Sequence, residues 1–145
     1  MYLERYSYQT NESFLDYEFV SEGPKGNIKK IVRFTAISNN IYNLGFGDLN
    51  EETGEISDTT VTNNNDSRKV LATVVATVHD FTQLHPDVWV IAKGSTKSRT
   101  RLYRIGISNY LPEINKEFEL YGLRDNQWQP FEKRKDYEAF IVKRK

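Results

Sequence analysis

Residues 88–104 read VWVIAKGSTKSRTRLYR, and the interpretation of the whole fold starts from this stretch. Its first five residues are apolar without alternation, which is typical of a strand buried on both faces. Gly94, Ser95 and Thr96 then give a turn of small residues, and a basic, helix-compatible segment follows. Such a unit points free backbone N–H groups and the positive end of a helix dipole at one place. The stretch therefore predicts a strand, a turn and a helix, with an anion site at the turn.

The segment before this strand, residues 67–84, is predicted to be a helix. Its β-branched run TVVATV locally favours a strand, but the apolar period is helical. The side chains that share one helical face are Val70, Leu71, Val74, Val75, Val78 and Phe81. Asn and Asp at residues 63–66 offer N-caps, and Pro86 marks the end of the helix.

Four strands are expected before that helix. Residues 15–22 and 28–37 flank the turn sequence GPKGN and predict a hairpin. Residues 42–48 predict a third strand and residues 55–62 a fourth. Alternation along the third strand puts Tyr42, Leu44, Phe46 and Asp48 on one face.

The second helix is expected from about Thr96, weakened by Gly106 and disturbed near Pro112. Residues 118–123 and 137–143 predict two final strands, joined by a polar loop. The order β-β-β-β-α-β-α-β-β predicts an α+β fold with a twisted, mostly antiparallel sheet and two main helices. We expect a single domain over residues 1–145, with residues 55–92 forming a right-handed parallel crossover.

Composition limits the function classes. The 145 residues include no cysteine, which excludes disulfides, thiolate zinc sites and a cysteine nucleophile. No apolar stretch approaches the roughly 20 residues of a membrane span. We expect a cytoplasmic protein without a membrane partner.

Charge is unevenly distributed, although the net charge is zero. Residues 1–66 carry five Lys/Arg and eleven Asp/Glu, whereas residues 67–145 carry fifteen and nine. One interpretation is that the halves attract each other within the fold. The other is a basic face for a phosphate or a nucleic acid, and the lack of an overall basic charge argues against the nucleic acid.

The candidate anion-binding residues lie on the second helix and its turn: Ser95, Thr96, Lys97, Arg99, Arg101, Tyr103 and Arg104. Lys97, Arg101 and Arg104 share one side of the helix at positions i, i+4 and i+7. Leu102, Ile105 and Gly106 lie opposite, and we expect them to face the core. These cations are interpreted either as ligands for an anion or as a solvated helix face.

Arg99 lies beside the apolar face of that helix, so we expect it to be partly buried and paired with a carboxylate. The candidate acidic partners are Asp48, Asp58 and Asp66. The same three carboxylates could hold divalent metal ions, but Asp also favours turns and caps. The sequence therefore assigns neither a metal ligand nor a catalytic residue, and no cofactor is identified.

Three segments carry a resemblance to a family of uncharacterised bacterial proteins. They are residues 42–48 (YNLGFGD), residues 64–66 (NND) with residues 69–74 (KVLATV), and the motif GSTxxRTRLYR at residues 94–104, where x is any residue. The resemblance covers roughly residues 15–143 and implies no known activity. Such proteins usually carry Gly where this chain has Asn64 or Asn65.

A second resemblance is topological. The element order is similar to the core of the GNAT acetyltransferase fold, and Leu102-Tyr103 followed by Gly106 is similar to that family's Leu-Tyr…Gly segment. This likeness implies Tyr103 as a general acid. However, the family binds acetyl-CoA through a glycine-rich loop, and this chain has the glycine-free sequence VTNNNDS at residues 61–67. The resemblance therefore implies the fold more than the activity.

Three function classes remain from the sequence. The first is a non-catalytic binding or interaction protein. The second is an enzyme or binding protein for a phosphate-bearing small molecule, with a pocket between residues 94–104 and the Asp48 strand end. The third is a nucleic-acid-associated protein.

Overall fold

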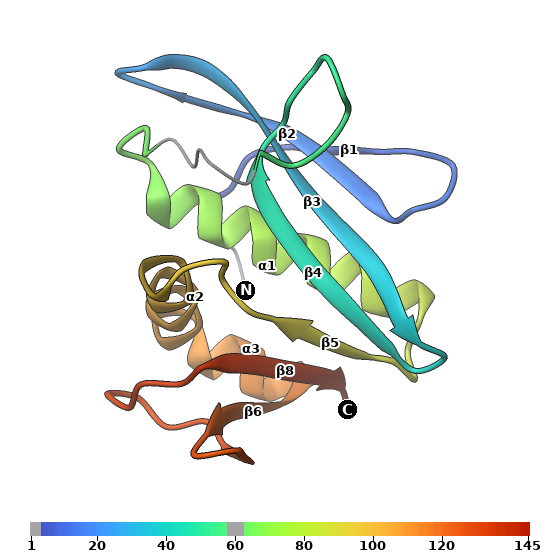
Figure 1. Ribbon diagram of the computed structural model, residues 1–145, viewed down its shortest axis with the longest axis vertical. Helices are drawn as coiled ribbons and strands as arrows, with labels where there is room; N and C mark the ends of the chain where they lie inside the picture. The colour runs from blue at the N-terminus through green and yellow to red at the C-terminus, as the bar shows by residue number, and fades with distance from the viewer. Residues whose placement is uncertain (1–3, 58–62) are drawn as a thin grey trace. The chain divides into compact units, whose positions relative to one another are not determined.

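The computed structural model describes residues 4–57 and 63–145, and its architecture is α+β, as predicted (Figure 1). The strands are β1 (Gln9–Thr10), β2 (Asp16–Gly23), β3 (Gly26–Ser38), β4 (Ile41–Asp48), β5 (Trp89–Ala92), β6 (Phe118–Arg124), β7 (Gln127–Pro130) and β8 (Ala139–Arg144). The helices are α1 (Ser67–Leu84), α2 (Lys97–Asn109) and α3 (Leu111–Glu117). Hydrogen-bonded neighbours follow the order β1-β2-β3-β4-β5-β8-β6-β7 in an open, mostly antiparallel sheet.

The chain divides into two compact units. Of the described residues, the N-terminal unit holds 4–35, 45–57 and 63–81, and therefore most of α1. The C-terminal unit holds Ala36–Leu44 and Thr82–Lys145, and therefore β5 to β8 with α2 and α3.

In the N-terminal unit, α1 packs against the hairpin of β2 and β3 through part of its predicted apolar face. Val75 and Val78 of that face are only half-buried, whereas the threonines at positions 73 and 77 are fully buried. The Phe81 ring stacks on Phe34 with 4.0 Å between ring centroids, and both side chains are buried. Tyr17 meets Phe34 edge-on, as aromatic pairs prefer. The apolar period of residues 67–84 therefore identified the helix correctly, even though the local composition favours a strand.

The alternation predicted for β4 is also confirmed. Phe46 stacks on Phe19, whose ring is part of the buried face of β2. On the same face, the Lys30 ammonium forms an ion pair with Asp48, and the Lys30 side chain is only 2% exposed. Asp48 thus holds a buried cation, as we expected of an acid on the apolar face, but the cation comes from the neighbouring strand.

Asn64 fixes the loop before α1 to the tip of the β2–β3 hairpin. Its side-chain amide donates to the Gly26 carbonyl oxygen at 2.8 Å, and its Oδ1 accepts from Lys25 N at 2.7 Å. Gly23 allows this contact, because a Cβ there would lie 2.1 Å from the Asn64 carbonyl oxygen. Asn65, in contrast, is exposed and has a φ of 60°, in the left-handed region that favours glycine.

Glycine is therefore expected to be tolerated at Asn65 and harmful at Asn64. Asn64→Gly should lower the free energy of unfolding by about 2–3 kcal/mol, because buried hairpin groups lose their partners. Asn65→Gly should change it by less than about 0.5 kcal/mol, since relief at positive φ offsets the greater entropy of the unfolded chain. Urea unfolding of both variants checks this, and equal losses would show that Asn64 does not anchor the hairpin.

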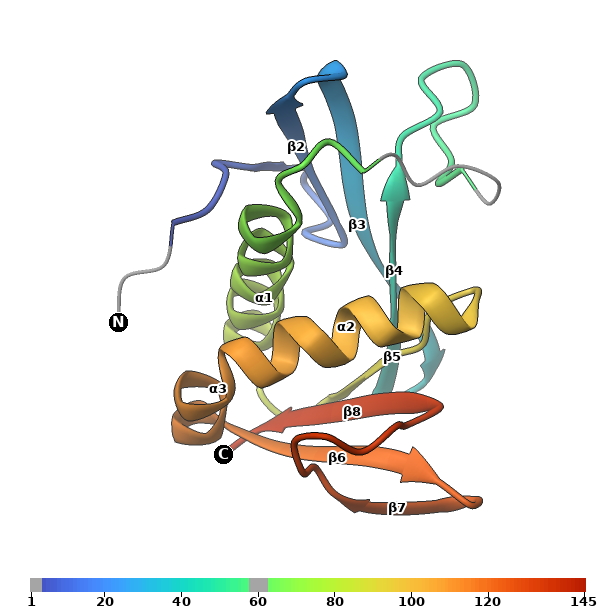
Figure 2. The same cartoon turned by 90° about the vertical axis from the view of Figure 1, so that its left-hand side faces the viewer.

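In the C-terminal unit, β5 lies between β4 and β8. Ile41–Leu44 of β4 pair in parallel with β5, and β5 pairs antiparallel with β8. β6 pairs antiparallel with both β8 and β7. Figure 2 shows β8, β6 and β7 side by side, with α2 leading into α3.

Several sequence predictions need correction. In the predicted strand over residues 55–62, the described part forms only an isolated bridge between Leu49 and Ile56, and residues 58–62 lie outside the described residues. The parallel partner of β5 is therefore β4, not the 55–62 segment. The polar loop after β6 contains β7, and the region near Pro112 forms the separate helix α3, with Pro112 in its first turn, where proline is tolerated.

Candidate functional site

The start of α2 is capped by Thr96. Its backbone is extended, with φ −135° and ψ 163°, and its side-chain oxygen accepts from Arg99 N at 3.2 Å. The Thr96 carbonyl oxygen accepts from Thr100 N at 3.1 Å. In the described part of the chain, the backbone N–H groups of Lys97 and Ser98 have no acceptor, as expected for the first positions of a helix.

Gly94 and Thr100 lock the turn between β5 and α2. Gly94 N donates to Thr100 Oγ1 at 3.1 Å, and Thr100 is buried. A Cβ on Gly94 would lie 2.3 Å from Thr100 N. The small residue at position 94 is therefore required by the close approach of the turn to the first turn of the helix.

This contact decides which face of α2 is buried and corrects our expectation. Leu102 and Ile105 are 41% and 38% exposed, whereas Thr100 and Gly106 are buried. Because the Thr100 hydroxyl bonds back to Gly94, the side of the helix that carries Thr100 turns inward. Leu102 and Ile105 consequently do not form the core face.

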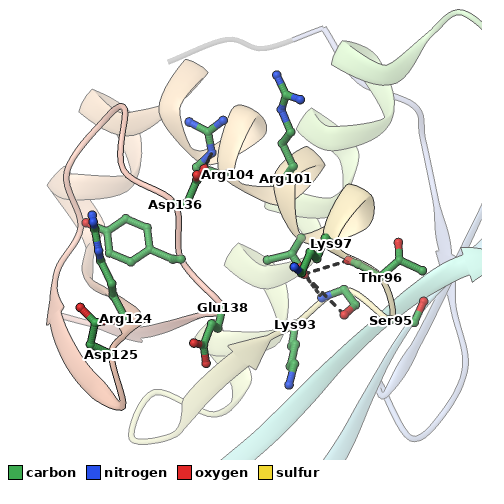
Figure 3. Close-up of a pocket in the computed structure, with 13 residues that line it drawn as sticks. Lys93, Ser95, Thr96, Lys97, Arg101, Arg104, Arg124, Asp125, Asp136 and Glu138 are labelled. Atoms are coloured by element: carbon green, nitrogen blue, oxygen red, sulfur yellow. Dashed lines mark hydrogen bonds and ion pairs between the residues drawn. The ribbon is translucent and has the colours of Figure 1, made fainter.

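A pocket of about 800 Å³ opens beside the start of α2 (Figure 3). One wall comes from the β5–α2 turn and α2, and the other comes from the β6–β7 turn and the residues before β8. The first wall is formed by Lys93, Gly94, Ser95, Thr96, Lys97, Thr100, Arg101 and Arg104. The second wall is formed by Arg124, Asp125, Asp136, Tyr137 and Glu138.

Strand register explains the second wall. Ala92 of β5 pairs with Phe140 of β8, so the residue two positions before Phe140, Glu138, falls near the turn at Gly94. Glu138 N also donates to the Leu123 carbonyl oxygen at 2.8 Å, which brings the end of β6 alongside.

The tip of the β6–β7 hairpin carries another part of this wall. Asp125 and Asn126 have φ values of 54° and 62°, as required of both central residues of a type I′ turn. Arg124, Asp125, Asp136 and Glu138 were not selected from the sequence. The dipeptide Asp125-Asn126 was the signal that predicts the hairpin and places its tip beside β8.

Among the three α2 cations that line this pocket, Arg104 has the least exposed side chain. Its Nε is buried without a hydrogen-bond partner, and the nearest carboxylate oxygen is Asp136 Oδ1 at 3.6 Å. The Asp136 side chain is 98% exposed. The ion pair is long and its carboxylate is solvated, so it leaves Arg104 able to bind another anion.

Tyr103 does not line the pocket, and burial raises its pKa to about 12, with a smaller lowering by the Arg99 guanidinium. The phenol therefore keeps its proton at neutral pH. Since the ordinary tyrosine pKa is 10.0, stability should fall as the pH rises from about 10 to 12, where the folded chain holds a proton that the unfolded chain loses.

Tyr103→Phe is expected to remove this part of the pH dependence. The variant should lose less free energy of unfolding than the wild type between pH 10 and pH 12, which urea unfolding at several pH values would measure. Equal losses in both proteins would contradict the raised pKa of Tyr103.

The other predicted site residues in the described part of the chain have partners within their own compact unit. The Arg99 guanidinium donates to Ser95 Oγ, although we expected an acid from residues 48–66. Asp48 pairs with Lys30. Asp66 accepts hydrogen bonds at 2.5 Å from both Tyr6 and Ser21. The partly buried Arg99 is thus held by the turn that precedes its own helix.

The third candidate acid, Asp58, lies outside the described residues. Within residues 4–57 and 63–145, no group of three His, Cys, Asp or Glu side chains could hold a metal ion. The carboxylates near the pocket are Asp125, Asp136 and Glu138 instead.

The chain belongs to a family of unknown function, DUF6934, whose model matches residues 2–145. No curated protein and no solved structure matches the chain. The likeness to the acetyltransferase fold stays a prediction. In the described part of the chain, no helix has both the length and the apolar character needed to cross a membrane.

Proposed function

We propose that the protein is a non-catalytic binding protein that holds a phosphate-bearing small molecule in the pocket beside α2. One observation carries the proposal: five cationic residues line one cavity of about 800 Å³, and only Arg104 among them has an ion pair within the described residues. The other four are Lys93, Lys97, Arg101 and Arg124. Three carboxylates also line the cavity, so its formal net charge is +2 (five minus three), which a dianionic group would compensate.

The start of α2 supports the same ligand. Its first turn has no acidic residue, and Lys97 occupies its first position, where a cation opposes the helix dipole. The N–H groups of Lys97 and Ser98 lie at this end of the helix. A bound anion would accept from these groups and offset the unfavourable placement of the cations.

A small molecule fits this pocket better than a nucleic acid does. Three carboxylates line the cavity and would repel a phosphate backbone that runs across it. The net charge of the chain is zero, whereas nucleic-acid-binding domains are usually basic.

Binding without catalysis is favoured over acetyl transfer. Tyr103, the acid that the acetyltransferase resemblance implies, is absent from the pocket lining. The loop at the position of the acetyl-CoA site is anchored to the β2–β3 hairpin through Asn64. We place the binding in the cytoplasm, since a chain without cysteine needs no oxidising compartment.

Calorimetric titration with inorganic phosphate at low ionic strength tests the proposal. We expect saturable binding, and Arg104→Gln should weaken it about tenfold, as for the loss of one charge-assisted hydrogen bond. The matched control is Lys116→Gln, which removes one exposed positive charge from α3, outside the pocket. It should leave the affinity within about twofold.

An opposite change provides the complementary check. Asp136→Asn removes the carboxylate that competes for Arg104, so it should strengthen phosphate binding. If the wild type binds no phosphate, or if Lys116→Gln weakens binding as much as Arg104→Gln does, the pocket is not the binding site.

A further inference from the structure

The two walls of the pocket differ in charge: the α2 wall carries four cations, and the facing wall carries three carboxylates and the Arg124 guanidinium. Lys93, Lys97 and Arg101 lie on the α2 wall, and the carboxylates of Asp125 and Glu138 lie on the facing wall. Within the described residues, one ion pair connects the two walls, that of Arg104 with Asp136. Figure 3 shows Glu138 between the turn that carries Arg124 and Asp125 and the side chain of Lys93.

Unlike charges pair when their side chains reach each other, so their separation here requires a structural cause. The α2 wall is held by the bond between Gly94 and Thr100. On the facing wall, the left-handed conformation of Asp125 fixes the turn, and Glu138 N is bonded to the Leu123 carbonyl oxygen. In the described part of the chain, Asp125 and Glu138 form no ion pair with the cations of the α2 wall, and both walls are fixed by backbone contacts.

We propose that the ligand is a phosphorylated amine, whose phosphate meets Lys97 and Arg104 and whose protonated amino group meets Glu138 and Asp125. This inference rests on the proposed function of the same pocket. A ligand with both charges brings a counter-charge to each wall, whereas a phosphate without an amine leaves the carboxylates of Asp125 and Glu138 uncompensated. The carboxylates would also repel simple phosphates and so contribute specificity.

Two compounds that differ only in the amine provide the test: 2-aminoethyl phosphate and ethyl phosphate, titrated by calorimetry into the intact protein. We expect the wild type to prefer aminoethyl phosphate about fivefold, the size of an exposed ion pair. Glu138→Gln should reduce this preference toward one. Because the two compounds differ by one positive charge, a distant loss of negative charge also shifts this ratio, so a control at a carboxylate outside the pocket is needed.

The matched control is Glu113→Gln, which removes one carboxylate from α3, outside the pocket, and should keep the preference of the wild type. Equal affinities of the wild type for the two compounds would overturn the inference and leave phosphate binding intact. The inference would also be overturned if Glu138→Gln and Asp125→Asn each retained the full preference of the wild type. Failure of both compounds and of inorganic phosphate to bind would instead contradict the proposed function itself.

Discussion

Lys30→Ala is expected to lower the free energy of unfolding by about 3–5 kcal/mol, because it leaves the buried Asp48 carboxylate without its cation. Lys30 lies in the middle of β3 with its side chain 2% exposed, and Asp48 is 12% exposed. A buried carboxylate that loses its counter-ion keeps its desolvation cost without the attraction that offset it. Lys30 lies opposite Phe19 in the strand register, and the Phe19 ring stacks on Phe46, so the loss should reach the core of the N-terminal unit.

The adjacent residue provides a matched control. Lys29 pairs with Glu51 on the surface, and these side chains are 54% and 65% exposed. Lys29→Ala should cost less than about 1 kcal/mol, as is typical of solvated ion pairs. Urea unfolding followed by circular dichroism measures both variants. Similar losses for Lys29→Ala and Lys30→Ala would contradict the buried pair.

Gly94→Ala is expected to lower stability by about 3 kcal/mol, the upper part of the range for overpacking. The added Cβ would lie 2.3 Å from Thr100 N and 2.7 Å from the Arg99 carbonyl carbon, which are backbone atoms that yield only if the first turn of α2 moves. Since the same turn forms one wall of the pocket, phosphate binding should weaken together with stability.

The neighbouring change Ser95→Ala serves as its control. Ser95 is exposed, and its hydroxyl accepts from Arg99, so its loss should cost less than about 1 kcal/mol and leave the turn in place. Thermal unfolding and calorimetric titration on both variants separate the two effects. A Gly94→Ala protein as stable as Ser95→Ala would show that the turn does not need the close approach.

The elements with a clear period were predictable from the sequence. The helical face of residues 67–84 identified α1, and the alternation of residues 42–48 placed Asp48 on a buried face. The cation beside Asp48 could also have been found. In the hairpin, Lys30 alternates with Val32 and Phe34, which puts its ammonium on the same face as Asp48.

The orientation of α2 was not predictable from hydrophobicity. Leu102 and Ile105 carry its apolar side chains, yet a hydrogen bond from Gly94 to Thr100 turns a different side inward. This hydrogen bond depends on the conformation of the turn at residues 94–96, which the spacing of apolar residues does not reveal. The anion-binding candidates Lys97, Arg101 and Arg104 nevertheless line one pocket, since they share a side of the helix whatever its rotation.

The second wall of the pocket lay beyond sequence reasoning for a different reason. Its residues come from the β6–β7 turn and the segment before β8, and their position depends on which strand lies beside β5. The antiparallel pairing of β5 with β8 brings Glu138 to the turn at Gly94. The order of the strands along the chain does not say which strands pair, so the position of Glu138 could not be derived from it.

The position of phosphate on the protein tests the central claim most directly. In a titration followed by 1H–15N NMR, we predict saturable shifts of the Lys97 and Ser98 backbone amides, with smaller changes at the Glu138 amide on the facing wall. The Lys29 and Glu51 amides of the N-terminal unit should not move. If millimolar phosphate leaves the Lys97 and Ser98 amides unshifted, the cations beside α2 are a solvated surface and the proposed binding function is wrong.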